Sequence, residues 1–196
     1  MIVMIVLAHP DEGSFNHAIA KAVIDSLREK GHDVRFHDLY KEKFNPILPT
    51  AEIPKDGPID PVIRKYCDEL QSSGGIIIIH PNWWGQPPAI LKGWIDRVVR
   101  PGVAYEFKEG DGGEGVPIGL LESKIALVFN TSNTPEEREH AVFGDPLEVL
   151  WEKCIFDLCG VKQFERRMFS VVVTSTIEKR KEWLIEAKRI VKKYFH

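Results

Sequence analysis

The sequence predicts an α/β protein built on a doubly wound parallel sheet of five strands, with helices on both faces. Short, fully apolar runs recur along the chain, and such runs are typical of strands buried on both faces of a parallel sheet. Segments with apolar residues at three- and four-residue spacing alternate with them, as amphipathic helices do. No linker or internal repeat divides the 196 residues, so we expect one domain over residues 1–196.

The N-terminal part of the chain is predicted to form a strand, helix, strand unit. Residues 2 to 9 are an Ile/Val/Leu run that suits the centre of a sheet. An apolar stripe marks a helix from residues 14 to 30, and Gly31 is its C-terminal stop. Residues 34 to 36 alternate in polarity and mark the second strand. Units of this kind are nearly always right-handed crossovers between parallel strands.

The middle of the chain is predicted to hold a loop and three further elements. Prolines at five positions between residues 46 and 61 favour an irregular connection. A helix over residues 62 to 70 precedes a fully apolar strand at residues 76 to 79. Another helix covers residues 89 to 99. On it we expect only surface or interface ion pairs from three charged residues, Lys92, Asp96 and Arg97.

The C-terminal part is predicted to complete the sheet. Several glycines make residues 108 to 117 a mobile loop. Residues 125 to 130 form the fourth strand, and an apolar stripe over residues 147 to 158 marks a helix. Residues 164 to 173 form the fifth strand, and residues 183 to 194 the terminal helix.

Composition excludes several classes of protein. Lys plus Arg number 26 against 29 for Asp plus Glu, so the net charge of −3 supplies no cationic field for nucleic acid. Three cysteines without a Cys-x-x-Cys pair form no disulfide framework, which favours a reducing cytoplasm. The apolar N-terminus is too short for a signal peptide, and no run approaches the roughly 18 residues of a membrane span, so any membrane contact is peripheral.

Three loops are expected to form the ligand site, because ligands of doubly wound sheets bind beyond the carboxyl ends of the strands. These loops are residues 9 to 14, 80 to 88 and 131 to 136. The first loop leads into a helix N-terminus, whose free backbone N–H groups and dipole suit a phosphate. Ser14 and Asn16 add donors, and His9 offers a further one. Neither a dinucleotide fingerprint nor a P-loop is present.

The second and third loops have different chemistry. Trp83 and Trp84 follow a core strand directly, so their rings must cover a partner subunit, the protein's own core or a flat ligand. Residues 131 to 135 are rich in hydroxyl and amide groups, which suit the polar edge of a heterocycle. Turn formation and helix capping explain the third loop nearly as well.

Several motifs occur in the order found in one known family. They are Leu7-Ala8-His9 with Ser14-Phe15-Asn16, then Pro81-Asn82-Trp83-Trp84, then the run from Pro88 to Val98 and residues 102 to 105. In these motifs the chain resembles the NAD(P)H:quinone oxidoreductase family of flavodoxin-like flavoproteins. The resemblance implies a flavodoxin-like fold and noncovalent FAD or FMN. It implies flavin-binding roles for His9, Ser14, Phe15 and Asn16 on the phosphate arm, Pro81, Asn82, Trp83, Trp84 and Gly85 along the ring, and Thr131, Ser132, Asn133 and Thr134 at the ring's polar edge.

The resemblance also implies an activity. The expected enzyme is an NAD(P)H dehydrogenase (quinone), which passes two electrons from NAD(P)H through flavin to a quinone or similar acceptor by a ping-pong mechanism. It implies a homodimer with the active site near the subunit boundary. No catalytic residue is assigned, because the family's Tyr/His pair is not evident and only His140 lies as a candidate between residues 135 and 145. Asn133-Thr134 also stands where the mammalian pattern has two glycines.

Two alternatives compete with this interpretation. A flavodoxin-like electron carrier, or a regulatory flavoprotein subunit of a transport system, would share the fold and the flavin. The stretch from Ala8 to Glu12 also resembles the start of zinc-dependent sugar deacetylases, but no second ligand motif follows it, so we expect no metal. The choices between FAD and FMN and between NADH and NADPH stay open.

Overall fold

A five-stranded parallel sheet forms the centre of the computed structural model, which describes residues 1–108, 110–111, 113–121 and 124–196. All neighbouring strands in it run parallel, in the order β2-β1-β3-β6-β7. The five-stranded, doubly wound sheet predicted from the sequence is therefore confirmed. The strands are β1 Ile2–Leu7, β2 Asp33–Asp38, β3 Gly75–Pro81, β6 Ile125–Thr131 and β7 Gln163–Phe169.

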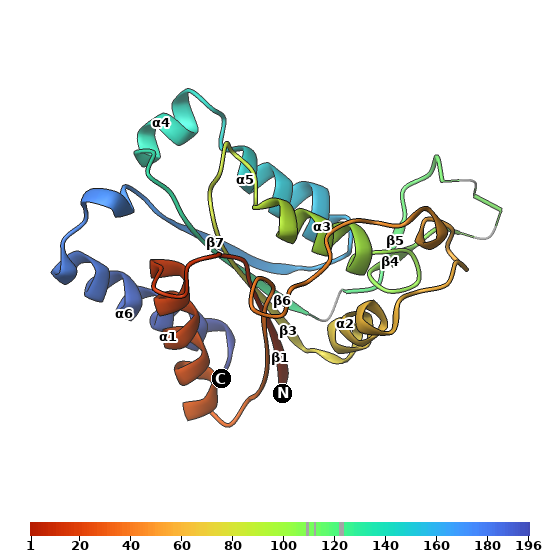
Figure 1. Cartoon of the computed structure of the whole chain (residues 1–196), viewed down its shortest axis with the longest axis horizontal. Helices are drawn as coiled ribbons and strands as arrows, with labels where there is room; N and C mark the ends of the chain where they lie inside the picture. The colour runs from red at the N-terminus through yellow and green to blue at the C-terminus, as the bar shows by residue number, and fades with distance from the viewer. Residues whose placement is uncertain (109, 112, 122–123) are drawn as a thin grey trace.

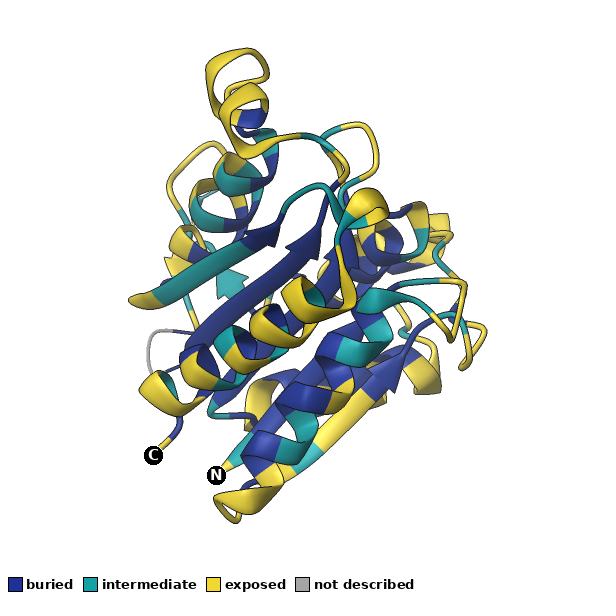
Figure 2. Ribbon diagram, turned by 90° about the vertical axis from the view of Figure 1, so that its left-hand side faces the viewer, coloured by how far each residue is buried: buried dark blue, intermediate teal, exposed yellow. Residues whose placement is uncertain are grey.

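Helices cover both faces of the sheet (Figures 1 and 2). One face packs against α1 Phe15–Glu29 and α6 Ile177–Tyr194. The other face packs against α2 Pro61–Ser72, α3 Ala89–Val98 and α5 Pro146–Glu148, which continues directly as the π-helix η2 Val149–Asp157. Within the described ranges, no helix has both the length and the apolar character needed to cross a membrane.

Side chains of β1 alternate between the two cores. Val3, Ile5 and Leu7 pack with α1 and α6, whereas Met4 and Val6 pack with α2 and α3. All these residues are fully buried. The uninterrupted apolar runs in the sequence therefore exist because both faces of the central strands are covered.

Several strand boundaries differ from the prediction; β3, for example, runs to Pro81 rather than ending at residue 79. β1 ends at Leu7 rather than at residue 9, and β7 ends at Phe169 rather than at residue 173. Val171 adopts a left-handed φ of 56°, which stops β7, and the following 3₁₀ turn is η3 Val172–Thr174. The amide of Val172 donates to the carbonyl of Ser132 over 3.1 Å. This contact folds the chain across the end of the sheet.

Several short elements were not predicted. The helix α4 Glu136–Ala141 has the sequence EEREHA, which contains no apolar stripe to signal it. The 3₁₀ turn η1 Thr50–Glu52 lies inside the proline-rich connection. The antiparallel ribbon β4 Tyr105–Glu106 and β5 Ile118–Gly119 flanks the loop predicted at residues 108 to 117 (Figure 1). Two members of that loop, Glu109 and Gly112, lie outside the described residues.

The charged residues of α3 correct one expectation. Lys92 and Asp96 form an exposed ion pair at 2.5 Å, as predicted. Arg97 is instead 3% exposed, and its Nη2 and Nε donate to the two carboxylate oxygens of Glu52 over 2.6 and 2.9 Å. One turn earlier, a Cβ on Gly93 would lie 2.2 Å from the carbonyl oxygen of Pro46. The distinctive motif on α3 therefore serves to hold the proline-rich connection against the helix.

Candidate active site

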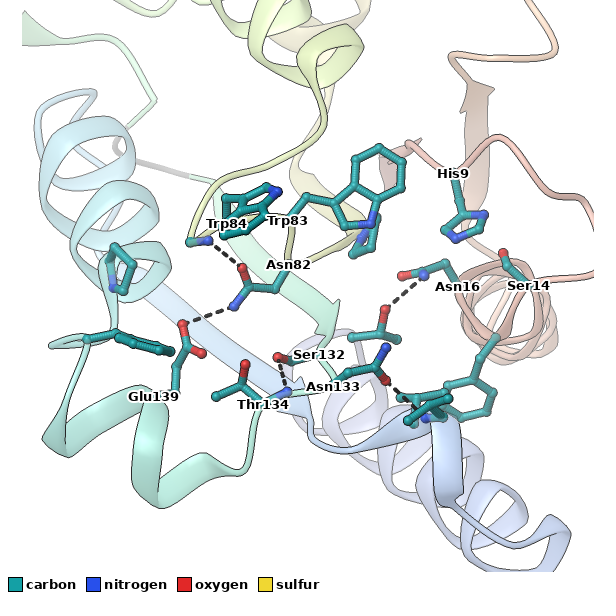
Figure 3. A pocket seen from close by; sticks show the side chains of 18 of the residues that line it. His9, Ser14, Asn16, Asn82, Trp83, Trp84, Ser132, Asn133, Thr134 and Glu139 are labelled. Carbon is teal, nitrogen blue, oxygen red and sulfur yellow. Dashed lines mark hydrogen bonds between the residues drawn. The ribbon is translucent and has the colours of Figure 1, made fainter.

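A cavity of about 820 Å³ opens at the carboxyl ends of β1, β3 and β6, where the strand order reverses (Figure 3). The three loops nominated from the sequence form most of its wall. Every predicted site residue lines it: His9, Ser14, Phe15, Asn16, Pro81, Asn82, Trp83, Trp84, Gly85, Thr131, Ser132, Asn133 and Thr134. The structure thus brings the whole predicted set together, and the binding of flavin by these residues stays a prediction.

The N-terminus of α1 forms one corner of the cavity. Ser14 caps the helix, and its Oγ accepts from the amide of His17 over 3.4 Å. The first-turn amides of Phe15 and Asn16 donate to no group in the described part of the chain. Unpaired N–H groups at the positive end of a helix dipole form a site for an anion.

His9 stands beside this corner as a neutral ring. Its Nδ1 lies 3.1 Å from the amide nitrogen and 3.2 Å from the carbonyl oxygen of Asp11, so Asp11 pairs with this nitrogen in either tautomer. Burial lowers the pKa of His9 below its ordinary value, so the ring is mainly neutral at pH 7. Its ring centre lies 6.2 Å from that of Trp83, which places it between the first and second loops.

Asn16 carries an unsatisfied acceptor. Its Nδ2 donates to Oγ1 of Thr131 over 2.9 Å, and this bond joins α1 to the end of β6. Its Oδ1 is buried and accepts no hydrogen bond within the described residues. Such atoms are rare in native proteins, because a buried polar group without a partner is destabilising. A ligand hydroxyl that donates to Oδ1 would satisfy it.

Residues 83 to 86, which we call the tryptophan turn, form a tight reversal after β3. Trp83 and Gln86 exchange backbone hydrogen bonds of 3.0 and 3.1 Å. The two central residues, Trp84 and Gly85, have left-handed φ angles of 58° and 71°, as a type I′ turn requires. Trp84 is fully exposed and Trp83 is 41% exposed. Of the three alternatives stated for these rings, core packing is therefore wrong for Trp84.

His80 anchors the chain just before this turn. The ring is fully buried, and the indole N–H of Trp151 donates to its Nε2 over 2.9 Å. Because an indole nitrogen only donates, the histidine hydrogen lies on Nδ1 and donates to the carbonyl of Pro81 over 2.8 Å. Burial lowers the pKa of His80 to about 4. A neutral, fully paired histidine thus holds the strand end from which the turn projects.

The third loop is held by its own side chains. Oγ of Ser132 accepts from the amide of Thr134 over 3.0 Å, and Oδ1 of Asn133 accepts from the amide of Val173 over 3.0 Å. The turn-forming role considered for this loop is therefore confirmed for Ser132, whereas Asn133 joins the loop to Val173, 40 positions away. Among the residues that the structure describes, the amide of Asn133 has no acceptor. That amide is available to a ligand.

Other residues of the wall were missed by the sequence reasoning. α4 had no apolar stripe, and residues 172 and 173 were assigned to a strand. The sequence Gly144-Asp145-Pro146 is typical of a turn before a helix, and it was the signal in the sequence for the return of the chain to the cavity. His140, the candidate for proton delivery, does not line the cavity, and its Nδ1 lies 3.4 Å from a carboxylate oxygen of Asp145. The missed lining residues are Glu139, Phe143, Pro146, Val172, Val173 and Arg180.

The geometry does not support the zinc alternative. In the described part of the chain, no group of three or more His, Cys, Asp or Glu side chains is arranged to hold a metal ion. One carboxylate oxygen of Asp11 instead accepts from the amide of Gly13 over 2.8 Å. The carboxylate of Asp11 therefore shapes the loop itself.

Comparison with known proteins relates the chain to a group of oxidoreductases. A family model described as the flavodoxin-like fold matches residues 1–194. An uncharacterized NAD(P)H oxidoreductase of Haemophilus influenzae is 34% identical over 171 residues, which cover 85% of this chain and 82% of the relative. NAD(P)H dehydrogenase [quinone] 1 of Rattus norvegicus is 30% identical over 187 residues, which cover 84% of this chain and 67% of the relative.

A solved structure agrees with these relatives. The NAD(P)H:quinone oxidoreductase from Methanothermobacter marburgensis superposes with a TM-score of 0.85 at 25% sequence identity. The match covers 100% of this chain and 98% of that protein. The fold and its arrangement of strands are therefore shared over the whole length of both chains.

Proposed function

Because the chain belongs to the flavodoxin-like fold family, among its NAD(P)H oxidoreductases, we propose that it is a flavin-dependent NAD(P)H dehydrogenase (quinone). Its substrates would be NAD(P)H and a quinone or similar acceptor. Bound noncovalently as FAD or FMN, flavin would supply two-electron transfer between them. One observation carries the proposal: the three loops predicted to bind a flavin line the same 820 Å³ cavity.

The donors and acceptors at the α1 corner fit the phosphate arm of a flavin. The free amides of Phe15 and Asn16 suit a phosphate, and the ring of His9 lies in the wall beside them. The unpaired Oδ1 of Asn16 requires a donor, and the ribityl chain of a flavin carries hydroxyl groups. These residues would bind and orient the cofactor.

At the other end of the cavity, the tryptophan turn and the third loop fit a flat ring with a polar edge. Trp83 and Trp84 offer exposed aromatic surface, and in the described chain the amides of Trp84 and Asn133 donate to no protein group. The neighbouring amides of Gly85 and Thr134 already donate within their loops. We therefore assign the stabilisation of negative charge on a bound ring to the amides of Trp84 and Asn133.

The size of the cavity supports ping-pong kinetics. Pockets of roughly 300 to 1,000 Å³ each hold one compact organic ligand. The 820 Å³ cavity lies within that range, so a cofactor and its substrates would share one cavity rather than occupy separate sites. NAD(P)H and the acceptor would then occupy the same position in turn.

A homodimer would complete the site. Trp84 and Phe143 expose aromatic surface at the cavity, and Tyr105 and Phe107 form an edge-to-face pair at the β4–β5 ribbon. Two-fold pairing is the commonest way to bury such apolar surface. We propose that residues 1–196 form one flavin-binding domain in each subunit. We also propose a cytoplasmic location, in which the free cysteines Cys67, Cys154 and Cys159 stay reduced.

Titration and steady-state kinetics test this proposal. FMN or FAD, added at micromolar concentration, should quench tryptophan fluorescence and raise the melting temperature. The flavin-loaded protein should then oxidise NADH or NADPH only when a quinone is added, with parallel lines in double-reciprocal plots. Mass measurement of the released cofactor distinguishes FAD from FMN. Light scattering near 22.3 kDa at micromolar concentration would contradict the dimer.

The same measurements separate the alternatives. An electron carrier or a regulatory subunit would bind flavin but would not turn over NAD(P)H with a soluble quinone. A failure of both flavins to bind would reject the flavin-dependent mechanism itself.

A further inference from the structure

A buried carboxylate lies in the cavity wall, and no cationic side chain of the described residues is paired with it. Glu139 of α4 is 1% exposed, although its helix neighbours Glu137 and Arg138 are exposed. Charged side chains are seldom buried this fully unless they are paired. In the described part of the chain, Glu139 forms no ion pair; its Oε1 instead accepts from Nδ2 of Asn82 over 2.9 Å (Figure 3). A buried acid with one neutral partner needs an explanation.

Asn82 connects this carboxylate to the tryptophan turn. The side-chain oxygen of Asn82, Oδ1, accepts from the backbone amide of Gly85 over 2.9 Å. The backbone amide of Asn82 donates to the carbonyl of Thr131 over 2.6 Å. The turn that it holds contains Trp84 at a left-handed φ of 58°. A bulky residue persists in that conformation only where the surrounding contacts enforce it. The side chain of Asn82 supplies such a contact.

The carboxylate helps to fix which way the side-chain amide of Asn82 points. The NH₂ group of Asn82 only donates, and it lies 2.9 Å from Oε1 of Glu139, which accepts its hydrogen bond. The oxygen is thereby directed to Gly85, whose N–H only donates. Without Glu139, the NH₂ group of Asn82 loses its acceptor, and only the amide of Gly85 still fixes the side chain. The turn is then held by one side-chain contact that is itself no longer anchored to α4.

We propose that Glu139 is a positioning residue of the cavity, which acts through Asn82 to hold the tryptophan turn in its binding conformation. The hydrogen bond joins residues 57 positions apart in the sequence and couples the α4 wall to the turn. The hydrogen bonds between Glu139 and Asn82 and between Asn82 and the turn do not depend on which ligand binds. The consequence for flavin affinity rests on the function proposed above.

The test compares variants in the protein without and with added FMN. Glu139→Gln keeps an acceptor for Asn82, Glu139→Leu removes it, and Glu137→Leu on the exposed face of α4 is the matched control. Near-ultraviolet circular dichroism of the unloaded protein reports the setting of Trp83 and Trp84. Fluorescence titration with FMN reports affinity, and thermal melting reports stability.

Glu139→Leu should change the tryptophan dichroism and weaken FMN binding about tenfold, as the loss of one anchoring hydrogen bond would. Glu139→Gln should stay within about twofold of the parent, and Glu137→Leu should match it. Asn82→Ala should reproduce the effect, and adding Glu139→Leu to it should cause no further loss, because both act through one contact. Should Glu139→Leu not fold, Asn82→Ala and Glu139→Gln decide the matter.

Two results would overturn the proposal. One is unchanged dichroism in both Glu139→Leu and Asn82→Ala. The other is an equal loss in Glu139→Gln and Glu139→Leu, which would mean that charge matters rather than the hydrogen bond to Asn82. If the parent protein binds neither FMN nor FAD, the proposed function fails, whereas the dichroism of the unloaded variants still decides the role of Glu139.

Discussion

The tryptophan turn and helix α3 lie close together in the sequence and both carry tryptophan, yet they expose their apolar side chains very differently. Trp84 is fully exposed and Trp83 is 41% exposed, whereas Trp94 on α3 is 2% exposed. The helical period turns Trp94 and Val98 toward the sheet. In the turn, two left-handed residues reverse the chain so tightly that no face is left to pack on the core. Backbone conformation, not composition, therefore separates the binding surface from the scaffold.

The two regions also differ in how they are held. α3 has a bidentate, buried ion pair between Arg97 and Glu52. The turn is held by hydrogen bonds from neutral groups, chiefly the side chains of Asn82 and His80. We therefore expect substitutions in α3 to act on stability and substitutions in the turn to act on binding.

Trp94→Ala should have the largest effect on stability. Removal of a fully buried indole costs roughly 3 to 5 kcal/mol in the free energy of unfolding, through lost burial and the cavity left behind. Urea denaturation measures it. Trp83→Ala is the comparison, and it should lose far less stability while it impairs flavin binding or turnover. Equal losses of stability in both variants, with unchanged kinetics for Trp83→Ala, would mean that the turn stabilises the fold and does not bind the cofactor.

Glu52→Gln should destabilise the protein by about 3 kcal/mol, because the guanidinium of Arg97 would stay buried without a countercharge. Denaturation at neutral pH measures the loss. Asp96→Asn, which breaks the exposed pair with Lys92, is the control and should change stability by less than about 1 kcal/mol. A small effect at Glu52 would show that the loop on α3 is held mainly by its other contacts.

Acid should loosen the base of the turn through His80. Its pKa is about 4 in the folded protein, below the ordinary value of 6.5, so the unfolded chain takes up a proton that the folded chain does not. Stability from this residue is therefore complete above pH 6.5 and falls as the pH drops toward 4, on the order of 2 to 3 kcal/mol. Melting temperatures of the parent and His80→Asn across this range should converge at low pH. If the melting temperatures of the two proteins kept a constant difference across this range, His80 would not be the group that makes stability depend on pH.

Gly85→Ala should cost about 1 to 2 kcal/mol, because φ is 71° and the new Cβ would lie 2.7 Å from Cγ of Pro146. Gly102→Ala isolates the backbone part, since φ there is 76° and a Cβ would meet no atom within 4 Å. The difference between the melting temperatures of the two variants gives the cost of the contact with Pro146. An equal loss in both would mean that the proline ring moves aside freely.

Trp84 should have the smallest effect on stability and a clear effect on binding. Its side chain is fully exposed, so Trp84→Ala should change the free energy of unfolding by less than about 0.5 kcal/mol. Trp84→Gly should stabilise the protein by about 1 kcal/mol, because glycine relieves the left-handed φ of 58°. Both should weaken FMN binding in fluorescence titration. Unchanged affinity would remove Trp84 from the site.

Local sequence patterns were sufficient for the fold and for the position of the cavity. The apolar runs of β1 and β3 and the stripe of α3 are local properties, and parallel strands end at one edge by topology, so three loops far apart in sequence had to meet. The N-terminus of α1 was also predictable, because Ser14 caps it. α4 and η3 were not, since neither has an apolar period to signal it.

Only the tertiary structure decided which polar and aromatic side chains are buried, exposed or paired. Arg97 was expected in a surface or interface ion pair and is instead buried within the subunit, because Glu52, 45 positions away, approaches it. Glu139 was not singled out, because its role depends on Asn82, 57 positions away. The exposure of Trp84 follows from a turn whose conformation is set by such contacts. The periodicity of apolar residues is a property of neighbouring positions in the sequence. The burial and pairing of a side chain depend on partners that only folding brings together.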